Sequence, residues 1–268
     1  MLREEFIRAL RSRTLIIAIL VGIASFAQGF VDYISGPPLT PEYLSRLPPF
    51  YDNCYDAFIW AERGLIGLIV PFIAVLPFSD TLALDRTSGF LRSLLFRVSF
   101  IKYLLSKYVI SFVSGGFAVA IPMLLFFGFT NLVLPRGLNP DIFQQRVLSE
   151  PNALGPFGVL YQTHPDAYIF SLVGLGFLFG GVYAIFGLSI SAYIDNRYVV
   201  LATPFVVYIV SHYILAVIRM PAWSPLSAFV PNWVLNINWI NIFCSLTVIF
   251  LVSTIAYFAG AYKNQIRA

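Results

Sequence analysis

The sequence predicts an all-α membrane protein with six transmembrane helices, an N-terminal interfacial helix and a short cytoplasmic helix between the second and third spans. Three observations support this prediction. Two of them are compositional: 59% of the residues are hydrophobic and only 11% are charged, whereas a globular protein carries about 25% charged residues. The third is that the apolar residues gather into runs of membrane-spanning length. We treat residues 1–268 as a single transmembrane domain.

Residues 1–13 predict a short amphipathic helix. Leu2, Phe6 and Leu10 recur at every fourth position, and charged residues line the other side. This pattern fits either a helix lying along the membrane surface or a solvated flank of the first span. A signal peptide would also begin with a basic region, but the apolar run that reaches Val31 is long for one and five more runs follow.

Six apolar runs cover residues 14–34, 58–78, 103–134, 167–193, 199–218 and 237–261. Each reaches or approaches the ~20 helical residues that cross ~30 Å of hydrocarbon. The third run is longer than one crossing needs, which predicts tilting, kinking or projection beyond the bilayer. The runs lack the period-two alternation of membrane β-strands, so a barrel is excluded.

The basic residues near the span ends predict that both termini are cytoplasmic. With the N-terminus inside, the inner segments hold Arg3, Arg8, Arg11, Arg13, Arg86, Arg92, Arg97, Lys102, Lys107, Arg197, Lys263 and Arg267. The outer segments, which are together longer, hold Arg46, Arg63, Arg136, Arg146 and Arg219. The outer loops are then residues 35–57, 135–166 and 219–236. We expect a multi-pass protein of the plasma or inner membrane, prokaryotic in origin.

Few polar groups interrupt the apolar runs. A charge in mid-membrane costs roughly 2.5–3.5 kcal/mol, so Asp32, Glu62 and Arg63 are expected at interfacial depth. His212, beside Ser211, lies about two thirds of the way through the fifth run. It either faces a cavity or makes a helix-packing hydrogen bond.

The fourth run is rich in glycine. Gly176 and Gly180 form a small-xxx-small spacing that lets another helix approach closely. This spacing predicts a helix-packing position, which could be a dimer face. Alternatively, it reflects only the general frequency of glycine in membrane helices.

The residues that common catalytic and metal sites require are scarce. The chain has no G-x-x-x-x-G-K-[ST] loop, and neither of its two histidines, His164 and His212, belongs to an H-E-x-x-H pair. We therefore expect no enzyme activity, no metal site and no cofactor in this chain. The net charge of +4 follows from the placement of basic residues at the span ends, so nucleic acid is not an expected partner.

Residues 79–97, SDTLALDRTSGFLRSLLFR, form the longest basic segment between two runs. Ser79 or Asp80 can cap a short helix, and Ser88-Gly89 ends it. A second helix would then carry leucines toward membrane or protein, with Arg92 pointing to headgroups or to a partner. These features predict an amphipathic elbow on the cytoplasmic side.

Three features occur in a fixed order along the chain: a basic amphipathic N-terminus, a D-x-x-x-x-(D/E)-R-x-x-G element at residues 80–89, and L-x-x-L-L followed by K-Y-L-L-S-K. The second feature comprises Asp80, Asp85, Arg86 and Gly89. With these features and its six-span layout, the chain resembles the membrane subunits of type-2 ABC exporters.

The resemblance implies that the segment between spans two and three is a coupling helix, which lies in a groove of a separate ATP-binding subunit. The residues it assigns to coupling are Asp80, Asp85, Arg86, Ser88, Gly89 and Arg92. It also implies two ATPase subunits, which bind ATP and magnesium, a second permease copy or paralogue, and contact with membrane lipid. The exported substrate would be a lipid, a peptide or a drug-like molecule. The alternative is a non-transporting anchor or sensor that uses ATPase-driven motion to signal or to assist assembly of another protein.

Overall fold

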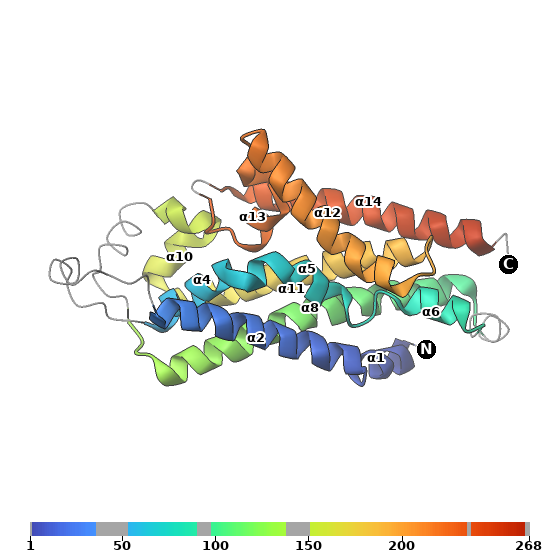
Figure 1. Cartoon of the computed structure of the whole chain (residues 1–268), viewed down its shortest axis with the longest axis horizontal. Coiled ribbons are helices and arrows are strands. Elements are labelled where there is room, and N and C mark those ends of the chain that lie inside the picture. The colour runs from blue at the N-terminus through green and yellow to red at the C-terminus, as the bar shows by residue number, and fades with distance from the viewer. Residues whose placement is uncertain (1, 36–52, 90–97, 138–150, 235–236, 266–268) are drawn as a thin grey trace.

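The computed structural model of this protein describes residues 2–35, 53–89, 98–137, 151–234 and 237–265 (Figure 1). These residues form helices and no strand, which confirms the all-α class. The elements are α1 (Leu2–Leu10), α2 (Arg13–Ser35), α4 (Cys54–Ala61), η1 (Glu62–Ile66), α5 (Gly67–Val75), α6 (Thr81–Thr87), α8 (Phe100–Val133), η2 (Pro151–Phe157), α10 (Gly158–Thr163), α11 (Pro165–Ser191), α12 (Arg197–Val217), η3 (Pro221–Trp223), α13 (Pro225–Phe229) and α14 (Trp239–Gln265).

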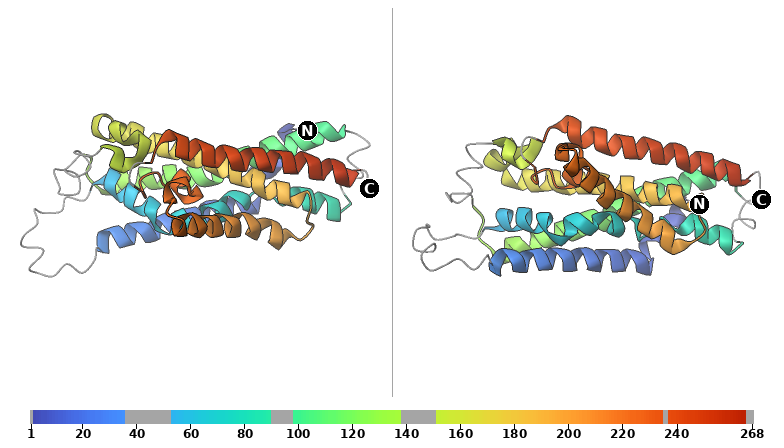
Figure 2. Two further views of the ribbon diagram at one scale, coloured as in Figure 1. Left: turned by 90° about the horizontal axis from the view of Figure 1, so that it is seen from above. Right: turned by 45° about the horizontal axis from the view of Figure 1, so that its top comes forward.

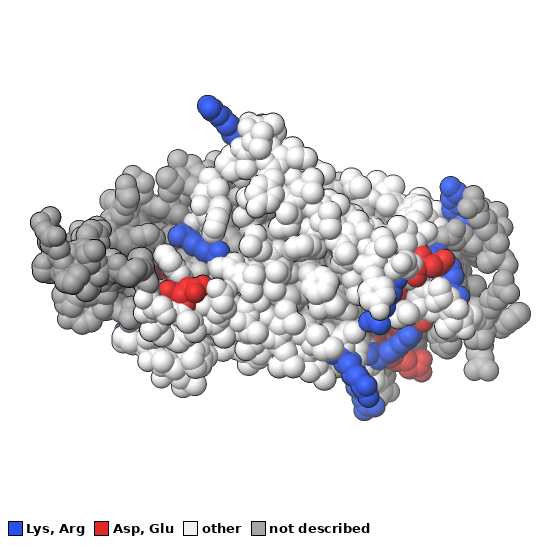
Figure 3. All heavy atoms as spheres, viewed as in Figure 1, with Lys and Arg blue, Asp and Glu red and all other residues white. Residues whose placement is uncertain are grey.

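Six helices of the described chain are long and apolar enough to cross a membrane. They are α2, the continuous stretch α4–η1–α5, α8, α11, α12 and α14. The predicted runs match them to within a few residues; the largest shift is in the second span, which covers Cys54–Val75 instead of 58–78. On the face in Figure 3, most charged side chains gather at the end that carries α6, and a broad uncharged belt crosses the middle.

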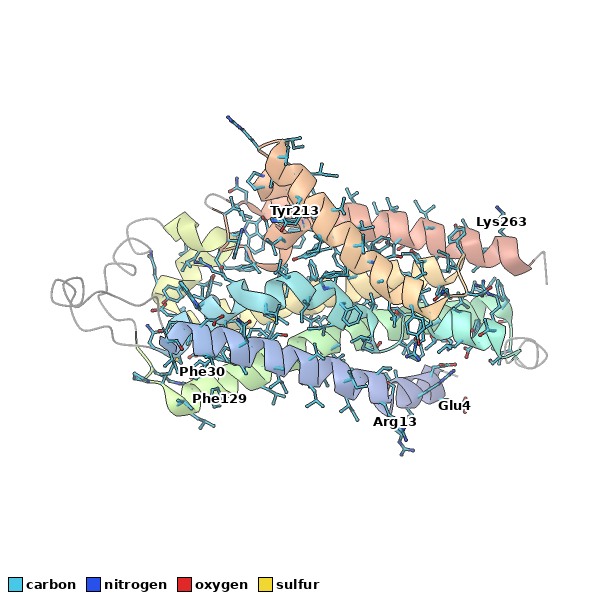
Figure 4. The ribbon with its side chains drawn as sticks, viewed as in Figure 1. Glu4, Arg13, Phe30, Phe129, Tyr213 and Lys263 are labelled. Carbon is cyan, nitrogen blue, oxygen red and sulfur yellow. The ribbon has the colours of Figure 1, made fainter. Side chains whose placement is uncertain are left out.

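The bundle is elongated, and its two ends differ in what they carry. Both termini and α6 lie at one end, while α10 and the start of α4 lie at the other (Figures 1 and 2). The labelled side chains Glu4, Arg13 and Lys263 belong to the end with the termini, and Arg13 points away from the bundle (Figure 4). We call this the terminal end and the other the distal end.

The centre of the bundle is the pair α8 and α11, around which α2, α5 and α14 pack. Glycine allows the pair to approach closely, because a Cβ added to Gly180 would lie 2.5 Å from the carbonyl oxygen of Gly115. Aromatic rings join α2 to α8: the ring centroids of Phe30 and Phe129 lie 5.3 Å apart (Figure 4). Helices α12 and α14 lie at the outside of the bundle, with most of their residues not buried.

The second span contains a single turn of π-helix, η1, with a kink at Gly64. The kink lies where α2 crosses at Gly29, whose added Cβ would be 2.7 Å from the Ala61 Cα. Just beyond it, the Tyr208 hydroxyl of α12 donates a hydrogen bond to the Gly67 carbonyl. A side chain of another helix therefore supplies a hydrogen bond to a backbone carbonyl near the irregular turn.

The segment after α12 folds back into the bundle. All five residues of α13 are buried, and Val230 and Asn232 after it are buried as well. The Ser224 side chain caps α13 by accepting from the Leu226 amide. Part of the predicted outer loop 219–236 is therefore interior to the protein.

Candidate functional site

The candidate site is the polar surface of α6 and the helices that hold it at the terminal end. Asp80 occupies the N-cap position of α6, and the helix ends at Thr87, followed by Ser88 and by Gly89 with φ +72°. A positive φ favours glycine, so the expected helix stop has a physical basis here. Exposed residues of α6 and its end are Leu84, Thr87, Ser88 and Gly89. Arg92 lies outside the described residues.

Asp85 is almost fully buried, with 2% of its surface exposed, and it is contacted by three charged or polar side chains. Its Oδ1 accepts from both terminal nitrogens of Arg8 at 3.2 Å. Its Oδ2 lies 2.7 Å from Lys107 Nζ and accepts from the Tyr103 hydroxyl at 3.0 Å. One carboxylate of α6 is thus bonded to α1 and to α8.

Lys107 also connects this group of side chains to Glu5 of α1. Its ammonium is fully buried, donates to Glu5 Oε2 at 3.1 Å, and lies 4.8 Å from the centre of the Phe78 ring. A buried charge requires such partners, since one that loses its counterion leaves the other uncompensated in a low dielectric. We call Glu5, Arg8, Asp85, Tyr103 and Lys107 the Asp85 cluster.

A second set of ion pairs joins α6 to the connection between α11 and α12. Asp80 Oδ2 lies 2.6 Å from Arg197 Nε, and Arg86 Nε donates to Asp195 Oδ1 at 2.6 Å. Arg86 also donates to the carbonyls of Ala192 and Ser191. Burial raises the pKa of Asp80 above its ordinary value, against the lowering effect of Arg197. Short helix α6 is therefore attached on both sides.

The predicted coupling residues divide into two groups. Asp80 and Asp85 are buried and Arg86 is largely covered, so these three hold α6 in place. Ser88 and Gly89 lie on the exposed end of α6. The charged residues of the D-x-x-x-x-(D/E)-R-x-x-G element thus point mainly into this chain and only its end faces outward.

Helix α1 forms where the N-terminal periodicity predicts it. Its charged residues Glu5 and Arg8 belong to the Asp85 cluster, while Phe6 and Ile7 are exposed. Ala9 is buried, and the side chains of Leu2 and Leu10 lie outside the described part of the chain. The exposed apolar residues leave a surface that lipid could cover.

A separate polar cluster lies in the second span. Glu62, expected at interfacial depth, is fully buried eight residues after that span begins. Its Oε2 accepts from Asn232 Nδ2 at 3.1 Å, and Asn232 Oδ1 accepts from Arg63 Nε at 2.7 Å. Arg63 also donates to the Asn232 carbonyl. The amide of Asn232 thus bridges the two charges.

The remaining predicted residues make contacts inside the chain. A Cβ on Gly176 would lie 2.5 Å from the Met123 sulfur, and one on Gly180 would meet Gly115. Both glycines therefore lie where α11 crosses α8, which leaves no room there for a second copy of the chain. His212 Nδ1 is 2.8 Å from the Ser224 hydroxyl, which caps α13.

Sequence reasoning missed several residues of these clusters. Arg197 enters the sequence analysis only as a basic residue at a span end, and Lys107 only as such a residue and as part of K-Y-L-L-S-K. Glu5, Tyr103 and Asn232 have no role in it. The signal for Lys107 was its place in K-Y-L-L-S-K, four residues after Tyr103 on one helical face. Among the described residues no group of three His, Cys, Asp or Glu side chains could hold a metal ion.

Comparisons of the chain with protein-family models, with curated proteins and with solved structures found no match. The functional interpretation therefore rests on the residues and their geometry.

Proposed function

We propose that this protein is the membrane subunit of an ABC exporter, which forms the export path for a lipid, peptide or drug-like substrate. Two features support the proposal. Six helices can cross a membrane. The short helix α6, between the second and third of them, lies at the same end as both termini. A receiver of force from a cytoplasmic ATPase requires this placement.

The single observation that carries the proposal is the burial of Asp85 against three side chains from two other helices. Through Arg8, Tyr103 and Lys107 it connects α6 to α1 and α8. A push on the exposed end of α6 would therefore move the N-terminal helix and the central helix together. The ion pair of Asp80 with Arg197 would carry the same motion to α12.

The proposed assembly needs other subunits. Two ATP-binding subunits would bind ATP and magnesium and contact α6 at Leu84, Thr87 and Ser88. A second permease copy or a paralogue would complete the export path. In this arrangement both termini are cytoplasmic and the protein resides in the cell membrane.

The exposed position of Leu84, with 38% of its surface accessible, provides a test that does not disturb the core. In the complex with its ATPase subunits, Leu84→Asp should lower ATPase binding and substrate-stimulated ATP turnover by at least tenfold. The matched control is Val159→Asp in α10, which is also exposed but lies at the distal end. It should leave both quantities near wild type. Equal behaviour of the two variants would refute α6 as the receiver.

Transport separates the exporter from the anchor or sensor of another protein's assembly. The purified complex in vesicles should move substrate only with ATP and only with α6 intact. A complex that assembles through α6 and hydrolyses ATP, yet moves no candidate lipid, peptide or drug, would favour the sensor.

A further inference from the structure

A buried glutamate in the second span has one carboxyl oxygen without a partner. Glu62 is 0% exposed, and its Oε1 has no hydrogen-bond partner among the described residues. Its Oε2 accepts a hydrogen bond from Asn232 Nδ2 at 3.1 Å. Glu62 lies eight residues after the start of the span, which is about 12 Å along the helix axis. The free oxygen is therefore well inside the apolar part of the bundle.

Arg63, the next residue, is not a direct counterion of Glu62. Its Nε donates to Asn232 Oδ1, and a second guanidinium nitrogen donates to the Asn232 carbonyl. No ion pair joins Glu62 to any residue that the structure describes. The other titratable group that interacts electrostatically with Glu62 is Tyr168 of α11, whose hydroxyl donates to the Leu154 carbonyl.

The surroundings of Glu62 are covered by the segment that folds back after α12. Every residue of α13 is buried, and so is Asn232 beyond it. This segment packs on the span just after Glu62, because a Cβ added to Gly67 would lie 3.4 Å from a methyl carbon of Val230. Glu62 is also the first residue of η1, and π-helical turns frequently occur at functional sites. In such a covered, apolar place an ionised carboxylate without a direct cation is costly.

The geometry selects a proton over a metal cation. Asn232 presents its Nδ2 to Glu62 and both of its oxygens to Arg63, so Glu62 Oε1 is the oxygen left to bind a ligand. Calcium takes about six to eight oxygen ligands, and magnesium requires nearly octahedral coordination. A group of three acidic, histidine or cysteine side chains that could supply them is absent from the described chain. A proton needs only one oxygen.

We propose that Glu62 Oε1 binds a proton while residues 225–232 cover the second span. The bound proton neutralises the carboxyl group and leaves Oε2 as the acceptor for Asn232. When the proton leaves, Glu62 and Arg63 face each other as opposite charges across the Asn232 amide. Because the covered site disfavours the ionised form, the proton stabilises the covered arrangement over one in which water reaches Glu62. The site does not require an ATPase partner, so it stands apart from the proposed export function.

Infrared spectroscopy of the full chain in vesicles tests the site, because a protonated carboxyl group absorbs at a different frequency from a carboxylate. At pH 7 the wild type should show a carboxyl band that Glu62→Gln loses. The matched control, Asp32→Asn, changes an exposed acid of α2 and should retain the band. Identical spectra of the wild type and Glu62→Gln would overturn the proposal. So would a band that sodium chloride removes and choline chloride does not, since a metal cation would then occupy the site.

A second measurement uses the unmodified sequence with glutamate labelled by ¹³C at the side-chain carboxyl. Glu62 and Glu5 are the buried glutamates of the described chain, and Glu5 is paired with Lys107. The carboxyl band should shift with the label and should exchange slowly in deuterium oxide. A band that the label leaves unshifted would belong to an aspartate and would overturn the proposal.

The pH dependence of stability gives a third readout. If the folded chain holds the proton and the unfolded chain releases it, the stability that the proton supplies is lost as the pH rises. The unfolding midpoint of the wild type relative to Glu62→Gln should therefore fall over the pH range in which the carboxyl band disappears. A relative midpoint that rises over this range would overturn the proposal.

Discussion

Asp85 and Glu62 are both buried carboxylates in a largely apolar bundle, but their surroundings differ. Asp85 is bonded to Arg8, Tyr103 and Lys107 on two other helices. Glu62 accepts one hydrogen bond, from Asn232, and its Oε1 has no hydrogen-bond partner among the described residues. Asp85 therefore contacts its cationic partners directly, whereas Glu62 is connected to Arg63 through the neutral side-chain amide of Asn232.

The difference indicates two mechanical roles. Removing one charge from the Asp85 cluster would leave the remaining buried charges without a counterion, which is costly. The cluster therefore holds α6 firmly to α1 and α8. The Glu62 cluster connects a kinked span to a re-entrant segment through hydrogen bonds that can be exchanged at lower cost. A rigid attachment of α6 at the terminal end and an adjustable joint in the second span would suit the proposed entry of force through α6.

The largest expected effect comes from the charge at the centre of the rigid cluster. Lys107→Met would remove the buried cation that Asp85 and Glu5 share and leave them only the half-exposed Arg8. Breaking a buried pair by removing one partner costs about 3–5 kcal/mol. Thermal unfolding in detergent should show this loss, and Lys102→Met, in the same helix but exposed, should unfold like the wild type. Equal stability of the two variants would show that the Asp85 cluster is not rigid.

The next effect should arise at the adjustable joint. Asn232→Ala removes the hydrogen bonds to both Glu62 and Arg63 and should cost about 1–3 kcal/mol in the same assay. Asn232→Asp keeps the size and an acceptor for Arg63 but places a second carboxylate against Glu62. It should therefore be at least as damaging as the alanine variant. If Asn232→Asp were stable, the amide would not bridge the two charges.

These two clusters also show how much of the structure can be predicted from the sequence. The six spans were predictable because hydropathy and length are sums over neighbouring residues. The position of Glu62 was not, because its burial depends on Asn232, 170 residues later, which folds back into the bundle. Likewise, Asp85 was identified as a site residue from its spacing, but its inward orientation depends on Arg8 and Lys107, which reach it from other helices.

A smaller effect is expected when the charge of Glu62 itself is removed. Glu62→Gln keeps an acceptor for Asn232 and relieves the burial of a charge, so its stability should stay within about 1 kcal/mol of the wild type. Asp85→Asn, by contrast, leaves Lys107 and Arg8 facing a neutral amide and should cost about 3–5 kcal/mol. Comparing the two unfolding midpoints in one detergent measures the difference. A Glu62→Gln loss as large as that of Asp85→Asn would make the two clusters equivalent.

The smallest effect concerns the pH dependence of the ion pair between Asp80 and Arg197, which joins α6 to α12. Because burial raises the pKa of Asp80, the folded protein holds a proton on it over a pH range in which the unfolded chain has lost that proton. Asp80 therefore contributes a stability that falls as pH rises through this range, above the ordinary aspartate pKa. Midpoints measured across acidic buffers should rise for Asp80→Asn relative to the wild type as the pH increases. Arg197→Gln should steepen the wild-type trend, since Arg197 lowers that pKa. The opposite trend would mean that the ion pair with Arg197 outweighs burial, and α6 would then be held as firmly on its α12 side as at Asp85.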